Sequence, residues 1–239
     1  MFIDAQKFGY QNELRFFLLL KLMYKEGKVQ LNDKDLQFIE YVEQIKTRAT
    51  TEKYIGLLSE LGYIGYNYKT GYCILNSFDK IRSFHGWEVR LAFPIDYTSY
   101  YKIQAVTGAV IYGYLHKDFW RKVKSKKSVQ IKGSTYNFLT SAFNYKKQYA
   151  PVSVIGVNKI FEISNSTASR LKRAAADEQF IKLKKNYSKP ILNLKMEKGM
   201  INLYDSPKDI VFKGGGYRFQ LIDTIYPLFY FIKRKKLKT

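Results

Sequence analysis

The sequence predicts an α+β protein, mainly helical with short β-hairpins, organised as two domains joined by a helical and strand connection. Apolar residues recur at helical spacing in several stretches, and Ser, Thr, Asn or Asp residues precede several of these stretches as suitable N-caps. Aromatic and β-branched residues alternate in shorter stretches around turn residues. The length of 239 residues is sufficient for two small domains.

The segment 1–76 contains a regular order of expected elements. A strongly apolar helix covers 10–26, and a short strand follows it. Asn32 and Asp33 are suited to cap a second helix over 34–44, and a third helix ends near Leu61. Aromatic residues after this helix alternate around a glycine-containing turn, which predicts a hairpin. The expected order is therefore helix, strand, helix, helix and hairpin.

The second half of the chain contains two further expected helices. The first is short and covers 154–162. Ser164 is a suitable N-cap for the second, over 165–179, because its hydroxyl can accept a backbone N–H of the next turn. Small and apolar residues recur on this second helix at i, i+3 and i+7, which predicts one buried face. That face consists of Ala168, Leu171 and Ala175.

The opposite face of the helix over 165–179 is polar and basic. Its residues follow the spacing i, i+3, i+4 and i+7, so they form one stripe along the helix. The stripe consists of Ser166, Ser169, Arg170 and Arg173. Two guanidinium groups and two hydroxyls in this arrangement suit hydrogen bonding with base edges and phosphates.

A lysine-rich segment over 180–194 follows this helix. Its alternation predicts two short strands around a turn at 185–188. The lysines of this segment are Lys182, Lys184, Lys185 and Lys189. The segment is therefore expected to be a basic hairpin beside the helix.

Two helices followed by a basic hairpin resemble the winged-helix class of DNA-binding domains, with a recognition helix over 165–179 and a wing over 180–194. The segment 1–80 resembles a second copy, since Leu61 and Gly62 are similar to the residues that join recognition helix and wing in that class. Asn158 and Glu162 stand where the class usually has a small residue and a glycine. The tandem arrangement resembles plasmid- or phage-type replication initiators and, equally, transcriptional regulators.

Charge is distributed unevenly between the two halves. The formal net charge is +21 with a pI of about 9.8. The segment 1–80 has a net charge of +1, and the segment 81–239 has the remaining +20. Such a surplus indicates a polyanionic partner. The near-neutral copy is therefore expected to serve in dimerisation or in auxiliary contact with DNA.

These observations divide the chain into four parts. We expect a near-neutral domain over 1–80, a connection over 81–98, a basic DNA-binding domain over 99–196, and a C-terminal extension with a basic tail over 197–239. The glycine run 214–216 in the extension lacks the spacing of a phosphate loop, so a flexible turn is expected there.

Catalysis is not expected, and neither is a metal or a cofactor. The chain has one cysteine, Cys73, and two histidines, His85 and His116, and it contains no phosphate loop or G-x-S-x-G motif. The uncharged stretch over 103–115 is much shorter than the run of about 20 residues that a membrane-spanning helix needs. We therefore expect no membrane partner and a cytoplasmic, DNA-associated protein.

The resemblance implies double-stranded DNA binding, as a replication initiator or transcriptional regulator, with a homodimer formed through the N-terminal domain as a candidate assembly. The alternative is a protein that coats or shapes nucleic acid without sequence preference. An RNA binder is disfavoured because no RNP-type aromatic strand motif is present. The residues expected to contact DNA are Asn165, Ser166, Thr167, Ser169, Arg170, Arg173, Lys182, Lys184, Lys185 and Lys189.

Overall fold

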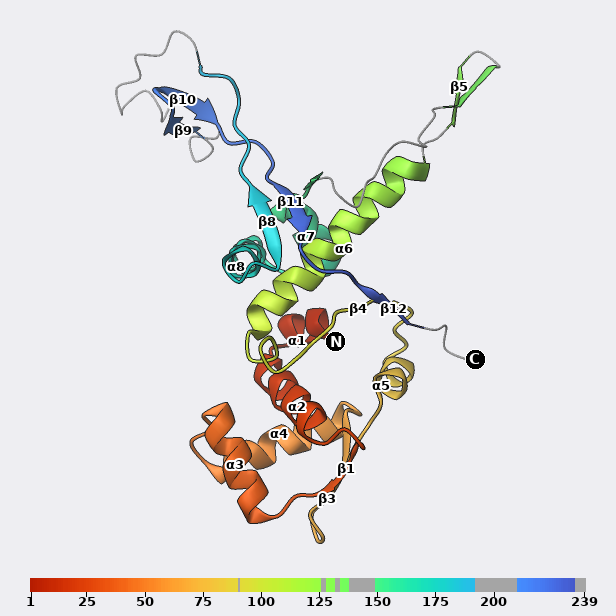
Figure 1. Ribbon diagram of the computed structural model, residues 1–239, viewed down its shortest axis with the longest axis vertical. Helices are drawn as coiled ribbons and strands as arrows, with labels where there is room; N and C mark the ends of the chain where they lie inside the picture. Colours follow the sequence, from red (N-terminus) through yellow and green to blue (C-terminus); the bar gives the residue numbers. More distant parts are fainter. Residues whose placement is uncertain (90, 126–127, 132–133, 138–148, 192–209, 235–239) are drawn as a thin grey trace. The chain divides into compact units, whose positions relative to one another are not determined.

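The computed structural model describes residues 1–89, 91–125, 128–131, 134–137, 149–191 and 210–234. Helices and small antiparallel sheets are combined in it, which confirms the expected α+β class (Figure 1). The chain forms two compact units. One consists of Met1–Thr107 together with the segment that begins at Tyr230, and the other consists of Gly108–Phe229.

The first unit contains the helix, strand, helices and hairpin expected from its sequence. Its elements are α1 (Phe2–Phe8), α2 (Gln11–Met23), β1 (Lys28–Gln30), α3 (Asp33–Glu43), α4 (Arg48–Glu60), β2 (Ile64–Asn67), β3 (Tyr72–Leu75), α5 (Phe78–Phe84) and β4 (Leu91–Ala92). The three strands β1, β2 and β3 form one antiparallel sheet in the order β1-β3-β2. The last strand of the hairpin is therefore the central strand of the sheet.

Local capping explains where the helices of the first unit begin. The side chain of Asn32 accepts a hydrogen bond from the backbone N–H of Asp35 at 3.0 Å, and the carboxylate of Asp35 accepts one from the N–H of Asn32 at 3.1 Å. This reciprocal capping box starts α3. Thr47 caps α4 in a similar way, because its hydroxyl accepts the N–H of Thr50 at 3.3 Å.

Aromatic and aliphatic side chains of α2, α4 and the sheet form the core of the first unit. Phe16, Phe17, Ile55 and Tyr63 are almost wholly buried. The rings of Phe17 and Tyr63 meet edge to face, with 5.1 Å between their centroids. The sheet and the helices packed on it therefore share one apolar interior.

A strand from the C-terminal segment completes the first unit. β12 (Ile232–Lys233) pairs antiparallel with β4. The guanidinium of Arg234 lies 2.9 Å from a carboxylate oxygen of Asp79, at the start of α5. The segment that begins at Tyr230 thus belongs to the unit formed by the start of the chain.

The second unit repeats the topology of the first with two added hairpins. Its elements are the part of α6 (Ile103–Ser125) from Gly108 onwards, β5 (Ser128–Ile131), β6 (Ser134–Asn137), β7 (Ala150–Pro151), α7 (Val154–Phe161), α8 (Asn165–Asp177), β8 (Ile181–Lys184), β9 (Ile210–Lys213), β10 (Gly216–Phe219) and β11 (Thr224–Pro227). Without the hairpins β5-β6 and β9-β10, the order is again helix, strand, helix, helix, strand and strand. The antiparallel sheet has the order β7-β11-β8, so the last strand is again central.

The prediction of a hairpin with a turn at 185–188 is wrong. β8 pairs with β11 instead, and the backbone beyond β8 continues extended, with Tyr187 bridged to Gln220 and the N–H of Ile191 donating to the carbonyl of Tyr217 at 2.9 Å. A turn at 185–188 would have placed Pro190, which has no N–H, inside the second strand. Residues 224–227 (β11), expected in a C-terminal extension, supply the central strand of this sheet.

Candidate nucleic-acid interface

Helix α8 begins where the sequence predicts. The hydroxyl of Ser164 accepts a hydrogen bond from the backbone N–H of Thr167 at 3.2 Å, so it acts as the expected N-cap. The helix ends at Asp177, slightly before the expected end. Gln179 adopts a left-handed conformation (φ 58°), and the N–H of Phe180 returns to the carbonyl of Ala175 at 2.9 Å. This closing turn leads directly into β8.

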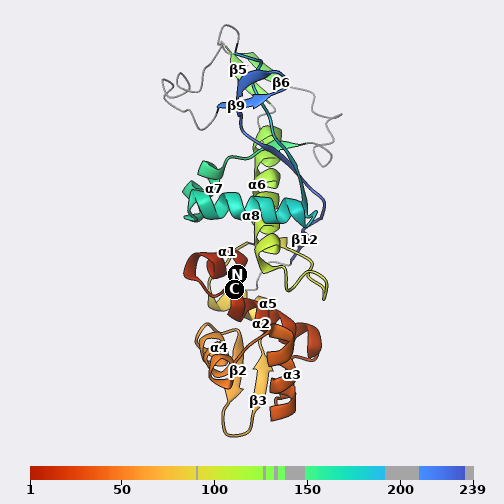
Figure 2. The same cartoon turned by 90° about the vertical axis from the view of Figure 1, so that its left-hand side faces the viewer.

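The predicted apolar face of α8 is buried, and it packs closely on α6. Ala168, Leu171 and Ala175 are at most 1% exposed. A Cβ on Gly108 would lie 2.1 Å from the carbonyl oxygen of Leu171, so only glycine permits this approach between the two backbones. The hydroxyl of Tyr112 donates to the carbonyl of Ala168 at 2.9 Å. Figure 2 shows α8 crossing α6, and this packing fixes which face of α8 points outward.

The outward face of α8 carries the predicted stripe. Ser166, Arg170 and Arg173 are exposed, and neither guanidinium forms an ion pair with a residue that the structure describes. Ser169 is half-buried at the edge of the stripe. Asp177, also exposed, continues the stripe at the C-terminal end of the helix. The stripe is therefore basic along most of its length and acidic at its end, which favours a polyanion at its N-terminal part.

The two remaining predicted residues of this helix, Asn165 and Thr167, lie at the start of α8. Asn165 is exposed and Thr167 is half-buried. The hydroxyl of Thr167 accepts a hydrogen bond from that of Ser164 at 3.0 Å, so the Thr167 side chain is partly used within the cap. The positive end of the helix dipole and the first-turn N–H groups make this end suited to a phosphate oxygen.

The turn between α7 and α8 accommodates the two residues that depart from the expected motif. Glu162 takes the left-handed conformation (φ 56°) that a glycine would adopt without strain. The side-chain amide of Asn158 donates to the carbonyl of Ile163 at 3.0 Å. This bond satisfies a backbone acceptor of the turn, which gives a physical reason for a polar residue at a position where a small one is usual.

The four predicted lysines lie along the ribbon formed by 181–191 and 217–227. Lys182 and Lys184 are exposed on one face of β8, whereas Ile181, on the other face, is buried. Lys185 and Lys189 are also exposed. None of the four forms an ion pair with another described residue. The lysines are therefore available to an external anion, although the strand that supports them comes from later in the chain.

The hairpin β9-β10 adds cationic residues that sequence reasoning did not assign to the interface. The ammonium of Lys213 lies 4.1 Å from the centroid of the Tyr187 ring. The guanidinium of Arg218 donates to the carbonyl of Ser188 at 3.0 Å and to that of Lys213 at 3.1 Å. The turn of this hairpin was expected to be flexible, but its flanking residues are bonded to the ribbon. The sequence did indicate a basic surface here, because Lys213 and Arg218 lie on the two sides of the glycine run 214–216.

Lys172 was also missed, and its role is internal. It lies between Ala168 and Ala175 on the buried face of α8, and its ammonium pairs with the carboxylate of Asp223. The side chains of Lys172 and Asp223 are 10% and 7% exposed. Lys172 is four residues after Ala168 and three before Ala175, a spacing that places it on the buried face and so indicates that its charge needs a partner. Nothing in the sequence identifies Asp223 as that partner, because it lies far along the chain.

The helix α4 of the first unit presents a different surface at the equivalent position in the topology. Thr51 is wholly buried, and its hydroxyl donates to Glu40 at 2.8 Å. Arg48 lies 3.2 Å from the carboxylate of Glu40 and 3.7 Å from that of Asp33. The cation at the start of α4 is thus neutralised within the unit, in contrast to the arginines of α8.

Within the described ranges, no three His, Cys, Asp or Glu side chains are grouped in a way that could hold a metal ion. Among the helices in those ranges, none combines the length and the apolar character that crossing a bilayer requires. Comparisons of the chain with protein-family models, with curated proteins and with solved structures find no match.

Proposed function

We propose that the chain is a double-stranded DNA-binding protein composed of two winged-helix domains, and that α8 is the recognition helix of the second. The support for two domains of this class is their shared element order and their shared strand order, β1-β3-β2 and β7-β11-β8. In such domains the second helix of the pair enters the major groove, and the strands that follow it contact the flanking backbone.

The observation that carries the proposal is the exposed stripe of Ser166, Arg170 and Arg173 opposite a fully buried face. The major groove of B-DNA is about 12 Å wide and admits an α-helix. A guanidinium can bond O6 and N7 of guanine with two parallel hydrogen bonds, and a good pair of this kind discriminates against other bases by about 1–3 kcal/mol. We assign this role to Arg170 or Arg173, and phosphate contacts to Asn165, Ser166 and Thr167.

The lysines of the ribbon supply affinity that does not depend on sequence. The four lysines are exposed and have no ion-pair partners among the described residues; they are Lys182, Lys184, Lys185 and Lys189. Each cation that neutralises a phosphate releases counterions, so binding weakens as the salt concentration rises. The segment 108–229 contains 22 Lys+Arg against 8 Asp+Glu, a net charge of +14, which adds long-range attraction to DNA.

The first unit is assigned to dimerisation or to auxiliary DNA contact. The segment 1–107 contains 14 Lys+Arg against 12 Asp+Glu, so its net charge of +2 offers little attraction to a polyanion. A replication initiator or a transcriptional regulator, of plasmid or phage type, would use two such domains in this way.

The second candidate function is that of a protein that coats or shapes DNA without sequence preference. It is favoured by the row of lysines without ion-pair partners in the described chain.

Selection from a pool of random duplexes at near-physiological salt tests the proposal. We expect one sequence motif to be enriched. Replacing Arg170 with Ala should reduce the preference for that motif by about tenfold, because one bidentate base contact is lost. Arg170→Lys is the matched control: it keeps the charge but not the planar fork, so it should lose the preference while retaining affinity for random DNA.

Lys185→Ala provides the complementary measurement. It should weaken binding to all duplexes by a similar factor and reduce the salt dependence by about one phosphate contact. Retention of DNA without any enriched motif would favour the coating protein. Equal effects of Arg170→Ala on selected and random duplexes would contradict the assignment of Arg170 to a base.

A further inference from the structure

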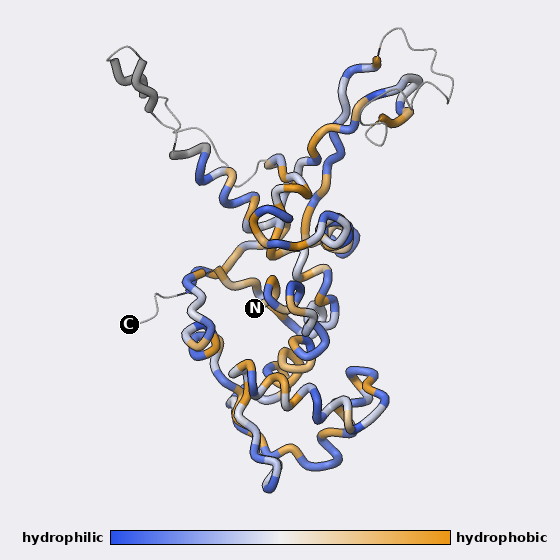
Figure 3. The backbone as a smooth tube through the Cα atoms, turned by 180° about the vertical axis from the view of Figure 1, so that it is seen from behind, coloured by the Kyte–Doolittle hydropathy of each residue, from blue (hydrophilic) through white to orange (hydrophobic). Residues whose placement is uncertain are grey.

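The first unit contains a cavity of about 530 Å³ bounded by α3, α4 and the β2-β3 hairpin. Volumes of about 300–1,000 Å³ are usual for sites that bind small organic molecules. Leu36 and Ile55, at 8% and 1% exposure, contribute the apolar part of its lining. The turn between β2 and β3, which forms one rim, is hydrophilic (Figure 3). The cavity therefore combines a buried floor with a polar edge.

Two tyrosines line the hairpin side of the cavity. The rings of Tyr66 and Tyr68 meet edge to face, with 4.9 Å between their centroids. Tyr68 is 65% exposed, and its hydroxyl lies 3.7 Å from the position that a Cβ on Gly56 would take. The ring thus reaches across to α4 while much of its surface remains accessible. An accessible aromatic face of this kind is suited to stacking against a planar ring.

Complementary charged groups line the α4 side. Glu52 lies one turn before Gly56, is exposed, and forms no ion pair with a residue that the structure describes. Arg48, one turn earlier, bonds with Glu40 and Asp33, but its Nη1 is buried without a hydrogen-bond partner in the described part of the chain. A carboxylate acceptor and a guanidinium donor therefore border the same cavity.

The phenol of Tyr66 lies within electrostatic range of both groups. Burial raises the pKa of Tyr66, and so do the neighbouring Cys73 and Tyr68, whereas Arg48 lowers it and Glu52, with the smallest effect, raises it. The charged side chains in the lining are Arg48 and Lys69 against Asp33 and Glu52, which sum to zero. A duplex backbone would gain little at such a site, because affinity for phosphates requires a positive surplus. A neutral, planar ligand with hydrogen-bonding groups fits better.

We infer that this cavity binds a guanine base. A carboxylate only accepts hydrogen bonds, so Glu52 selects a ligand edge with adjacent donors. Among the four DNA bases, guanine alone presents two neighbouring donors on its Watson–Crick edge, at N1 and N2. Its other edge carries the acceptors O6 and N7, which suit the donors of Arg48. Unpaired bases are commonly held in this way, by stacking on aromatic rings and by hydrogen bonds to their edges.

The base has two chemical sources: a free guanosine nucleotide, and an unpaired dG in single-stranded DNA. The inference does not depend on duplex binding by α8, since every lining residue belongs to the first unit. Titration calorimetry of the full chain with GMP, AMP, CMP and UMP tests the first source. Fluorescence anisotropy with an oligo-dT strand carrying one central dG, against oligo-dT alone, tests the second.

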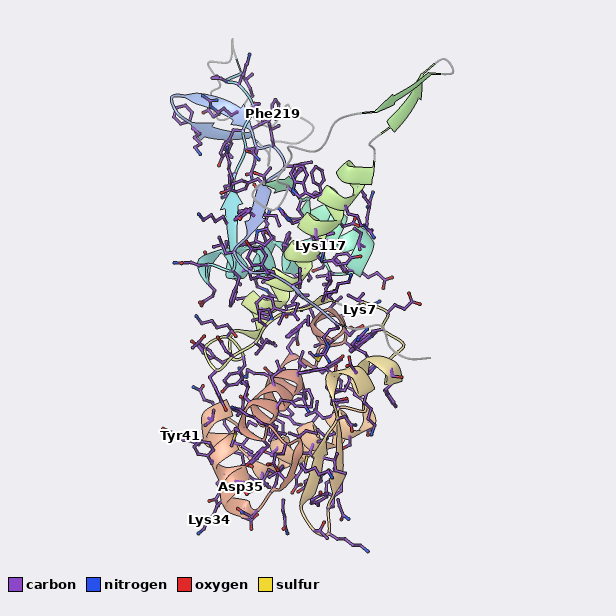
Figure 4. The ribbon with its side chains drawn as sticks, turned by 45° about the vertical axis from the view of Figure 1, so that its right-hand side comes forward. Lys7, Lys34, Asp35, Tyr41, Lys117 and Phe219 are labelled. Atoms are coloured by element: carbon purple, nitrogen blue, oxygen red, sulfur yellow. The ribbon has the colours of Figure 1, made fainter. Side chains whose placement is uncertain are left out.

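The variants Glu52→Gln and Tyr68→Ala remove the two proposed contacts. Each should weaken guanine binding by about tenfold, because a bidentate hydrogen-bonded pair or one base stack is lost. Both side chains are exposed, so the fold should be retained and circular dichroism should be unchanged. Glu60→Gln and Tyr41→Ala are matched controls outside the cavity, on α4 and α3 (Tyr41 is labelled in Figure 4). Neither control should alter guanine binding.

Binding of GMP, of the dG strand or of both, with loss in Glu52→Gln and Tyr68→Ala, supports the inference and identifies the source. Absence of binding to both probes overturns it. So does equal affinity for all four nucleotides, or unchanged guanine preference in Glu52→Gln. Duplex binding by the same variants should stay as in the wild type, which separates this outcome from the test of α8.

Discussion

The buried ion pair between Lys172 on α8 and Asp223, just before β11, allows the packing of the second unit to be tested quantitatively. Both side chains are at most 10% exposed, and the second carboxylate oxygen of Asp223 is buried without a hydrogen-bond partner among the described residues. Removing one member of such a pair leaves the other charge buried and uncompensated, which costs about 3–5 kcal/mol. We therefore expect Lys172→Met and Asp223→Leu each to destabilise the second unit by about this amount.

The double variant should behave differently from the sum of the single variants. If the two effects were additive, the loss would reach about 6–10 kcal/mol, comparable to the whole stability of a typical domain of about 5–15 kcal/mol. Replacing both charges with apolar side chains removes the cost of taking them out of water, so the double variant should lie within about 2 kcal/mol of the wild type.

Urea unfolding of the full chain, followed by a probe in the second unit, provides the assay. The chain has two tryptophans, Trp87 in the first unit and Trp120, which is 8% exposed, on α6 in the second. A Trp87→Phe background leaves Trp120 fluorescence as a reporter of the second unit, which matters because two units need not unfold together. Single variants that lose less than about 1 kcal/mol, or a double variant as unstable as the sum of the two, would contradict a buried and mutually compensating ion pair.

Two further predictions concern close packing and burial. Gly108→Ala places a Cβ 2.1 Å from the backbone oxygen of Leu171, so the helices must separate, and unfolding followed by Trp120 fluorescence should show a loss of about 1–3 kcal/mol; an unchanged midpoint would contradict the close crossing. Burial raises the pKa of Cys73 from 9.0 to about 11, so the folded thiol should resist iodoacetamide at pH 8 until urea unfolds the chain. Between pH 9.0 and about 11 the unfolded chain loses this proton first, and the free energy of unfolding should therefore fall more steeply than in Cys73→Ala.

Local signals in the sequence predicted the helices and their caps. Ser164 and Asn32 cap the helices that were expected to follow them, because a hydroxyl or amide oxygen near a first-turn N–H is a short-range interaction. The buried face of Ala168, Leu171 and Ala175 followed from helical periodicity alone. The exposed basic stripe was therefore predictable, since it is the opposite face of the same helix.

Long-range pairing was not predictable in the same way. The sequence around Lys184 indicated a strand but not its partner, because Thr224, which pairs with Lys184 from β11, lies far along the chain, beyond the β9-β10 hairpin. Lys172 similarly pairs with Asp223, and the buried hydroxyl of Thr51 on α4 donates to Glu40 on α3. Each of these contacts depends on how separate elements pack, which a local pattern does not specify.

The two units show how one topology can carry two different surfaces. Each places its second paired helix beside a three-stranded sheet with the last strand central. The exposed arginines of α8, Arg170 and Arg173, have no ion-pair partners in the described chain. On α4, by contrast, Arg48 is held by acids of α3, and Glu52 forms no ion pair with a described residue. A surplus of free cations suits a polyanion and a free carboxylate suits an edge of hydrogen-bond donors, so the same backbone arrangement is compatible with the two different ligands that we propose for the two units.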